Sequence, residues 1–415
     1  MVEIANSAVA RRASASDFVD PGLPSAASPS GEALGSLTAV LASAWRALSE
    51  RAIEPNGYYL PDWALAVDAS ARGRTGVSAL CAFSDASSAQ DCAPRLIGLL
   101  PVVSMWRACK IPLPALVSAI PYGTLCTPLL DRDMTDDAVC GLMRQAREAG
   151  AHALILRDVP LDGPAMKAFR EALRRDGVHP LVLHSQARAC LGATRDAEEL
   201  LCDALGAKKL KELRRQRHRL AEHGAVRLDV ARTREEVVAA LEIFLTLEAS
   251  GWKGKRGTAL LQDHGDANFV RRGAAALAET GQCEIATLRT GDTPVAAAIV
   301  LRHQHRAFYF KLGIDERFSK FSPGVQLTLD LTRHLCADPA IATADSTASA
   351  DHPMINPIWR GRFAIGDVLI PLRRNDPVVS LIHTALTLRR LVRVLARRVL
   401  AASRPANAKM RTIRD

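Results

Sequence analysis

The 415-residue sequence lacks several patterns that would assign it to a class at once. No two of its nine cysteines form a C-x-x-C pair, so neither a zinc ribbon nor a thioredoxin-like motif is expected. No run of about 18 apolar residues is present, and a membrane-spanning helix is therefore not predicted. Scattered cysteines are typical of a reducing compartment, and the first residues show no apolar secretory signal. These features predict a cytoplasmic protein.

Aromatic residues are also scarce, at 5% of the sequence. Because aromatic rings stack on unpaired bases, this scarcity argues against a nucleic-acid partner. The net charge of +10 does not reverse that argument, since it is concentrated at one end. From Arg389 onward, nine Lys or Arg residues face one Asp, an excess of eight. The rest of the chain is close to neutral.

The segment 251–260, GWKGKRGTAL, lacks the spacing of a phosphate-binding P-loop despite its three glycines and three cations. A P-loop places four residues between its first Gly and a Gly-Lys-Ser/Thr sequence. Here Gly251 and Gly254 are too close together, and Arg256 follows Lys255. The segment must therefore have another role.

Composition and periodicity divide the chain into four parts. Residues 1–35 are rich in Ala, Ser, Pro and Gly and are predicted to be disordered. Residues 38–190 form a first domain, which ends in a helix, a buried strand and another helix. Residues 191–375 form a second domain, and residues 376–415 form a basic amphipathic helix and tail.

The second domain gives the clearer signals. A long basic helix spans 196–223, and a short strand follows at 226–230. Thr233 and Glu236 make a capping box that opens a helix running to about Ser250. A further helix, three antiparallel strands, a glycine-containing turn, a helix and a strand follow.

This order resembles that of the GNAT superfamily, and more narrowly that of the BioF-like acetyltransferases associated with cellulose biosynthesis. The stretches that carry the resemblance are KKLKELRRQRHRLAEHG, LEASGWKGKRGTAL, VAAAIVLR and FYFKLGIDERFSKFSPGVQL. It covers residues 40–372 and implies an α/β (α+β) fold of tandem GNAT-like lobes, as in Fem-type transferases. Each lobe would be a mixed, mostly antiparallel sheet flanked by helices, with acetyl-CoA or another acyl-CoA as co-substrate and no metal.

The predicted phosphate site is the start of a helix at SPGVQ. A helix N-terminus offers unpaired N–H groups and partial positive charge, which suit a pyrophosphate. The residues are Ser322, Pro323, Gly324, Val325 and Gln326. The alternative is an ordinary helix start with Ser322 as its N-cap, and the stretch departs from the Arg/Gln-x-x-Gly-x-Gly/Ala pattern of GNAT proteins by having a single Gly. In the resemblance, the strand FYFKLGI binds the pantetheine arm at Leu312 and Gly313.

Acyl transfer to an amine needs a group that accepts a proton. The candidate bases are Glu248 at a helix end, Asp315 at a strand exit and Asp345 at the end of a later strand. Each has a structural alternative, as a solvated helix carboxylate, a turn-forming Asp or a loop cap. Glu316 is a further candidate base, and His352 is a weaker candidate in a loop, also assigned to substrate binding. No Ser/His/Asp or Cys/His order is evident, which favours direct transfer over an acyl-enzyme.

GWKGKRGTAL is predicted to border the acceptor. Trp252 would give a flat apolar contact, while Lys253, Lys255 and Arg256 would attract negative charge. The alternative is a surface loop with Trp252 buried in the core. The basic helix at 207–219 is either a solvated face or an attractor for an anionic acceptor such as a sugar acid.

The sequence therefore predicts an acyl-CoA-dependent N- or O-acyltransferase acting on a small-molecule or saccharide acceptor, such as a polysaccharide precursor. The C-terminal helix would contact the inner face of the membrane peripherally, or else would pack on its own domain. Two alternatives remain. One is a Fem-type transferase that uses aminoacyl-tRNA, and the other is a non-catalytic adaptor with a GNAT fold that binds a membrane surface or nucleic acid.

Overall fold

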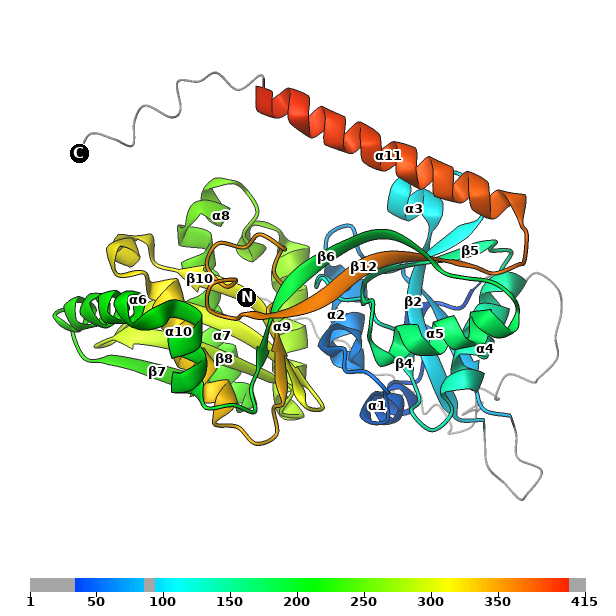
Figure 1. The fold of residues 1–415 in the computed structure, drawn as a ribbon. Helices are drawn as coiled ribbons and strands as arrows, with labels where there is room; N and C mark the ends of the chain where they lie inside the picture. The colour runs from blue at the N-terminus through cyan, green and yellow to red at the C-terminus, as the bar shows by residue number, and fades with distance from the viewer. Residues whose placement is uncertain (1–33, 86–93, 403–415) are drawn as a thin grey trace, which may run out of the picture.

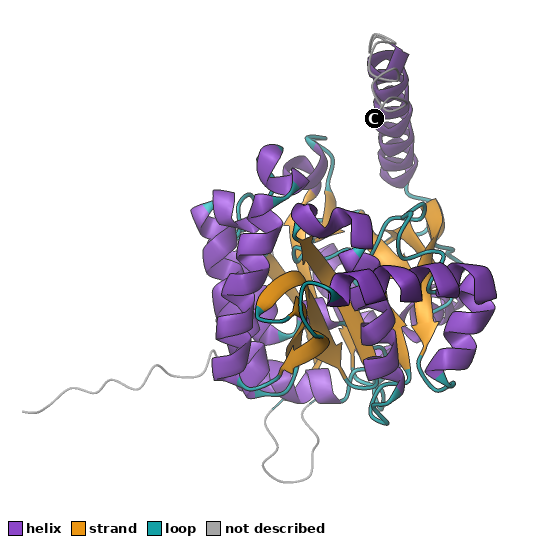
Figure 2. Ribbon diagram, turned by 90° about the vertical axis from the view of Figure 1, so that its left-hand side faces the viewer, coloured by secondary structure: helices purple, strands orange, loops and turns teal. Residues whose placement is uncertain are grey.

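The structure, a computed structural model, describes residues 34–85 and 94–402 (Figure 1). The predicted disordered segment thus lies outside the described residues, except for its last two positions. Within the described ranges, the chain forms two lobes whose strands join in one mixed sheet. Helices cover both faces of this sheet (Figure 2).

The N-terminal lobe contains the first five strands. Its strands are β1 (Ser78–Phe83), β2 (Leu96–Ser104), β3 (Ala115–Ser118), β4 (Leu129–Leu130) and β5 (Ala153–Pro160). Its helices are α1 (Ala42–Glu50), α2 (Pro61–Ser70), α3 (Met105–Cys109), α4 (Thr135–Glu148) and α5 (Pro164–Arg175). β3 and β5 run parallel, whereas β1, β2 and β3 pair antiparallel in that order.

The C-terminal lobe repeats this plan. Its strands are β7 (Val226–Ala231), β8 (Cys283–Thr290), β9 (Thr293–His303), β10 (Arg306–Ile314) and β11 (Thr343–Asp345). Its helices are α6 (Ala197–Ala221), α7 (Arg234–Ser250), α8 (Trp252–Lys255), α9 (His264–Glu279) and α10 (Pro323–Cys336). β7 to β10 form an antiparallel meander, and β10 and β11 are the parallel pair.

Two long strands, β6 (Leu181–Gly192) and β12 (Gly361–Pro371), join the lobes (Figure 1). The sheet order is β1-β2-β3-β5-β12-β6-β11-β10-β9-β8-β7, with β4 paired to β2. β12 pairs with β5 on one side and β6 on the other. The domain boundary predicted at residue 190 lies within β6, and residues 361–371 return to pair with β5 of the N-terminal lobe.

The predicted fold class is confirmed, because helices flank a mixed sheet that the two lobes share. The capping box is present, since the Thr233 hydroxyl accepts from the Glu236 N–H and the Glu236 carboxylate accepts from the Thr233 N–H. The long basic helix forms as α6 but is kinked at Gly206, whose φ of 71° is in the left-handed region that favours glycine. The predicted loop at 251–260 contains the short helix α8.

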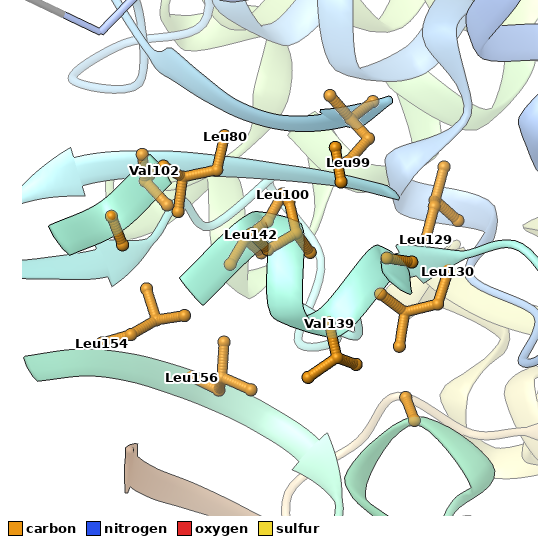
Figure 3. Packing of buried hydrophobic residues seen from close by; sticks show 14 of the residues in the cluster. Leu80, Leu99, Leu100, Val102, Leu129, Leu130, Val139, Leu142, Leu154 and Leu156 are labelled. Carbon is orange, nitrogen blue, oxygen red and sulfur yellow. The ribbon is translucent and has the colours of Figure 1, made fainter. Parts of the chain in front are cut away.

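The core of the N-terminal lobe lies between its sheet and the helices α4 and α5 (Figure 3). Val139 and Leu142 come from α4, and they pack with Leu80, Leu100 and Leu154 from three strands. All five side chains are fully buried, at 0% exposure. Each such side chain contributes about 1.5–3 kcal/mol through burial, so the helix is fixed on the sheet by its apolar face.

An aromatic cluster holds the lobes together. Tyr58 and Trp63 come from the N-terminal part of the chain, and they contact Phe308 and Phe310 of β10 at edge-on or tilted ring angles. Nearby, the backbone N–H of Asn56 donates to Nδ1 of the buried His303 at 2.8 Å. These contacts fix the N-terminal lobe against the strand that borders the candidate site.

The last helix, α11 (Pro377–Ala402), begins on the N-terminal lobe and then leaves the body (Figure 2). Val379 and Ile382 are buried in a cluster with Met105, Val117 and Leu369. Farther along, apolar side chains are exposed. No helix in the described ranges carries an apolar stretch long enough to cross a membrane.

Candidate functional site

A wedge opens in the sheet of the C-terminal lobe where β10 and β11 separate. The two strands pair only from Arg306 with Thr343 to Phe308 with Asp345. Directly afterwards, β10 has a bulge at Phe310, where its register with β9 shifts. A bulge bends its strand and strengthens its twist, so β10 diverges from its parallel neighbour at this point. The divergence leaves backbone groups of β10 without a neighbouring strand on that side.

A cavity of about 340 Å³ occupies this wedge. Its polar lining comes from Lys253, Lys311, Ser346, Thr347 and His352. Trp252, Leu312, Ile314, Met354 and Ile355 supply much of its apolar lining. None of the residues that line it is Asp or Glu. The cavity is therefore suited to a ligand that is neutral or negatively charged where it meets the two lysines.

Glu248 lies next to this cavity, and both oxygens of its carboxylate accept hydrogen bonds. Oε1 accepts from the Lys253 ammonium at 3.0 Å and from the Lys311 ammonium at 3.3 Å. Oε2 accepts from the Leu260 N–H at 2.9 Å. Burial alone would raise the pKa of Glu248, but these donors outweigh burial and hold that pKa below its usual value. A carboxylate stabilised in this way is a weak proton acceptor.

Lys311 is the group in the cavity that is best suited to accept a proton. Burial lowers its pKa, and the neighbouring Lys253 charge acts in the same direction, while Glu248 opposes both. A lowered pKa makes it easier for a lysine to be neutral, which is the form that a general base requires. The sequence predictions missed Lys311, although a lysine within the apolar strand FYFKLGI was a usable signal.

His352 also lines the cavity. Its Nδ1 accepts from the Ile355 N–H at 3.3 Å, so a neutral ring carries its proton on Nε2. Burial and then the Lys253 charge lower the pKa of His352, which favours that neutral form. A neutral imidazole with Nε2–H is a hydrogen-bond donor and is suited to polarise a carbonyl oxygen.

Asp345 lies at the seam of the lobes and does not line the cavity. Its Oδ2 accepts from Arg188 at 2.8 Å, and its Oδ1 accepts from the Thr347 N–H at 2.8 Å. Arg188 is fully buried and also donates to the carbonyl and hydroxyl oxygens of Thr124. Through this bond Asp345 holds Thr347 at the edge of the cavity, and its catalytic role stays a prediction.

Asp315 is brought to a different cavity, of about 680 Å³, together with Glu316 and Lys255. Its carboxylate binds the side chain and the N–H of Arg317, and the Arg317 guanidinium holds the pKa of Asp315 below its usual range. Glu316 forms an ion pair with Lys255 at 2.6 Å. The structure therefore separates Asp315 and Glu316 from the cluster around Glu248.

The predicted phosphate turn lies against the wall of the wedge cavity. A Cβ built on Gly324 would lie 3.0 Å from Leu312 and 3.3 Å from both Ile314 and Met354, which all line the cavity. Pro323 has no N–H, and the N–H groups of Gly324 and Val325 have no hydrogen-bond partner among the described residues. Ser322 makes no side-chain cap, contrary to its ordinary reading as an N-cap.

Two residues of the predicted donor site have structural partners instead. The Gln326 amide is buried and donates to the Leu213 carbonyl at 2.9 Å. Gly313 packs under α7, where a Cβ would lie 3.0 Å from the Glu248 backbone nitrogen. Neither Gln326 nor Gly313 lines the wedge cavity, whereas Leu312 does.

The segment GWKGKRGTAL contributes two residues to the lining of the wedge cavity. Trp252 is 52% exposed, so the alternative of a core tryptophan is wrong, and the Arg256 guanidinium lies over its ring. Trp252 and Lys253 line the cavity, whereas Lys255 and Arg256 lie outside it. A Cβ at Gly254 would clash with the Ala249 carbonyl oxygen, so this position requires glycine.

Comparison with known proteins agrees with this geometry. Residues 207–352 match the acetyltransferase (GNAT) domain, which includes the wedge, Glu248 and His352. No curated protein matches the chain. Residues 207–352 are therefore similar to the GNAT domain, while the narrower likeness to BioF-like enzymes stays a prediction.

Two solved structures resemble most of the chain, across both lobes. The structure of FemX is 13% identical, with a TM-score of 0.53, and the likeness covers 83% of this chain and 98% of that one. The C-terminal domain of a putative lysylphosphatidylglycerol synthetase from Agrobacterium fabrum is also 13% identical, with a TM-score of 0.50, and covers 83% and 95%. At this identity the likeness establishes the fold alone.

Proposed function

We propose that this protein is an acyltransferase that binds an acyl-CoA donor in the wedge between β10 and β11. The wedge carries the proposal, because the Phe310 bulge separates two parallel strands beside a cavity of about 340 Å³. Free backbone groups on a strand edge bind an extended chain of amides, such as the pantetheine arm. The free N–H groups at Gly324 and Val325, at the start of α10, would bind the pyrophosphate.

Direct transfer requires few groups. The amine or hydroxyl of the acceptor attacks the thioester carbonyl carbon, the C–S bond breaks, and the CoA thiolate leaves. Lys311 takes the proton that the acceptor loses, and the Nε2–H of His352 stabilises the carbonyl oxygen as charge develops. Glu248 is a positioning residue here, because it holds Lys253 and Lys311 on one side of the cavity.

The lining of the cavity favours an acceptor with a carboxylate or a phosphate near its reacting group. Lys253 supplies an ammonium group, Lys311 becomes a second one once it has taken the acceptor's proton, and no acidic side chain lines the cavity beside them. A saccharide acid fits this description, in keeping with a polysaccharide precursor as acceptor. A neutral sugar would leave the Lys253 charge without a counterpart apart from Glu248.

A binding experiment tests the donor. Acetyl-CoA is titrated by calorimetry against the full chain and against Ala348→Trp, which places a large ring in the wedge cavity. We expect binding to the wild type and at least a tenfold loss in the variant. Ala207→Trp on the exposed face of α6 is the matched control. Absence of acetyl-CoA binding to the wild type, or equal binding to Ala348→Trp, would refute the proposed donor site.

An aminoacyl-tRNA donor is the second candidate, and the face of α6 favours it. Lys208, Lys211, Arg214, Arg215 and Arg219 are exposed, and none forms an ion pair within the described residues. Such a face attracts a phosphate backbone. The test measures binding of tRNA and of acetyl-CoA to the wild type and to Lys211→Gln/Arg215→Gln. The aminoacyl-tRNA function replaces the acyl-CoA function if the wild type binds tRNA but not acetyl-CoA and the double variant binds tRNA more weakly.

The exposed part of α11 supports the proposal that the enzyme attaches to an anionic membrane surface. Leu381, Leu388, Leu391, Val392 and Leu395 are each at least 55% exposed. They follow one side of the helix at helical spacing, with arginines beside them. A basic amphipathic helix of this kind lies at the boundary between headgroups and acyl chains.

Vesicle flotation tests this attachment. Removal of residues after 377 would delete Val379 and Ile382 from the core, so substitutions are a cleaner test. We expect Leu388→Ser/Leu395→Ser to lose flotation with phosphatidylglycerol vesicles. Equal flotation of this variant and the wild type would end the proposal.

A further inference from the structure

A second cavity, of about 700 Å³, lies between the N-terminal lobe and α11. It forms where β3 and β5 separate. Their parallel pairing ends at Val117 with Ile155, and Ile155, Arg157 and Asp158 of β5 then line the cavity. This is the same place in the N-terminal lobe that the donor wedge occupies in the C-terminal lobe. The proposed acyl transfer makes no use of it.

The charged residues of this cavity divide into two groups. Four are arginines and two are acids: Arg157, Arg389, Arg390, Arg393, Asp158 and Asp367. None of the six forms an ion pair within 4.0 Å in the part of the chain that the structure describes. Opposite charges that line one cavity without pairing leave space for a ligand between them.

The arginines of α11 form one cationic wall. Arg389, Arg390 and Arg393 are spaced so that they share one side of the helix as it passes over the cavity. Arg390 is fixed by its bond to the Leu183 carbonyl at 2.8 Å. Arg157 faces them from β5, and one of its N–H groups donates to the Cys109 sulfur at 3.2 Å. Like charges gathered in this way repel one another unless an anion lies between them.

The opposite wall is acidic. The Asp158 N–H donates to Asp367 Oδ1 at 3.0 Å, and Asp158 adopts a φ of 45°, an uncommon conformation for a non-glycine residue. Burial and the neighbouring Asp367 raise the pKa of Asp158 to about 6. This pair of acids accepts hydrogen bonds from a hydroxyl or amine. Ile120, Leu386 and Val394 supply apolar surface between the walls.

We propose that this cavity is a binding site for a phosphorylated ligand with an apolar chain. The arginines hold the phosphate, since the guanidinium group binds phosphate oxygens in pairs. The apolar walls contact the chain, and Asp158 with Asp367 accepts from a hydroxyl or amine. The same phosphate chemistry occurs in a lipid headgroup and in a free phosphorylated metabolite, and the two sources differ in the apolar chain.

Calorimetric titration of the full chain tests the site. Octyl phosphate, below its micelle concentration, represents a phosphate with an apolar chain, and glycerol 3-phosphate represents a free polar phosphate. Octyl glucoside has the same chain without the charge. We expect octyl phosphate to bind at least tenfold more tightly than octyl glucoside. Binding of glycerol 3-phosphate as tight as that of octyl phosphate would overturn the apolar chain and leave only a site for a free phosphorylated metabolite.

Two kinds of variant locate the binding. Arg390→Gln/Arg393→Gln removes two charges from the cavity, and Arg214→Gln/Arg215→Gln removes two from the exposed face of α6 as the matched control. Ala108→Trp fills the cavity from α3 and leaves every arginine in place. We expect at least a tenfold loss of phosphate binding in the first and third variants and none in the control. If neither phosphate binds the wild type, or if binding is equal in all variants, the proposal is wrong.

Discussion

The Arg188 guanidinium lies 2.8 Å from the Asp345 carboxylate at the seam of the two lobes, and neither side chain is more than 2% exposed. Arg188 belongs to β6, which joins the lobes, and Asp345 ends β11 beside the donor wedge. The same guanidinium donates to Thr124 of the N-terminal lobe, whose hydroxyl donates to the Thr347 carbonyl. This one buried charge pair therefore fixes Thr124 at the contact between the lobes and Thr347 at the edge of the proposed site.

Asp345→Asn should unfold more easily than the wild type. Breaking a buried pair leaves Arg188 charged without a counterion, at a cost of about 3–5 kcal/mol in the free energy of unfolding. Urea denaturation measures this. Asp203→Asn removes an exposed partner of Arg195 and should cost less than about 1 kcal/mol. Unchanged stability of Asp345→Asn, with activity lost, would instead identify Asp345 as a catalytic base.

Gly313→Ala should separate α7 from β10. The new Cβ would lie 3.0 Å from the Glu248 nitrogen and 3.1 Å from the Phe244 carbonyl, both backbone atoms that cannot rotate away. Overpacking of this kind costs about 1–3 kcal/mol. Thermal unfolding should show the loss, while Gly192→Ala, which meets nothing within 4 Å, should not. Equal unfolding temperatures would contradict this close packing.

The sequence predicted the elements with strong periodicity and missed the contacts between distant ones. The meander, α7 with its capping box and the amphipathic α4 follow local patterns, and each formed as expected. β6 was not predicted, because its central position arises from pairing with β12, some 170 residues later, rather than from an alternating pattern.

The candidate site was predicted in part for the same reason. The stretches around Trp252 and Ser322 were assigned to the acceptor and to the donor's phosphates, and both lie at the wedge cavity. The partners of each acid were not visible in the sequence. Glu248 meets Lys311 only when α7 packs on β10, and Asp345 meets Arg188 only when β11 pairs with β6. These pairings give the acids structural partners that their positions in the chain do not reveal.

Acid should weaken the lobe contact through His303. Burial lowers the pKa of His303 to about 4, below its ordinary 6.5, and its two nitrogens are bonded to Asn56 and Ser49. Because the folded pKa is lowered, the unfolded chain takes up a proton first. Stability should therefore fall as the pH drops from about 6.5 to about 4, by on the order of 3 kcal/mol.

Urea denaturation across that pH range measures the effect. His303→Gln should lose this part of the pH dependence, although it will also be less stable at pH 7. His218→Gln, on the exposed face of α6, should keep the full slope. An identical slope in His303→Gln and the wild type would show that other groups cause the acid sensitivity.

Lys311→Met should slow acyl transfer while leaving donor binding nearly intact. Removal of a general base costs about 10²–10⁴-fold in kcat, whereas Lys311 makes only part of the cavity wall that holds the donor. Steady-state kinetics with acetyl-CoA separates kcat from KM. Lys255→Met, whose side chain pairs with Glu316 outside the cavity, is the matched control and should keep the wild-type rate.

The pH dependence of the same reaction distinguishes a base from a structural lysine. Because burial lowers the pKa of Lys311, the wild-type kcat should rise with pH and level off below the ordinary lysine value of 10.5. In Lys311→Met that rise should disappear together with the rate. A variant that is slower but keeps the wild-type pH profile would show that Lys311 only supports the cavity, and the proton would then have to pass to another group or to water.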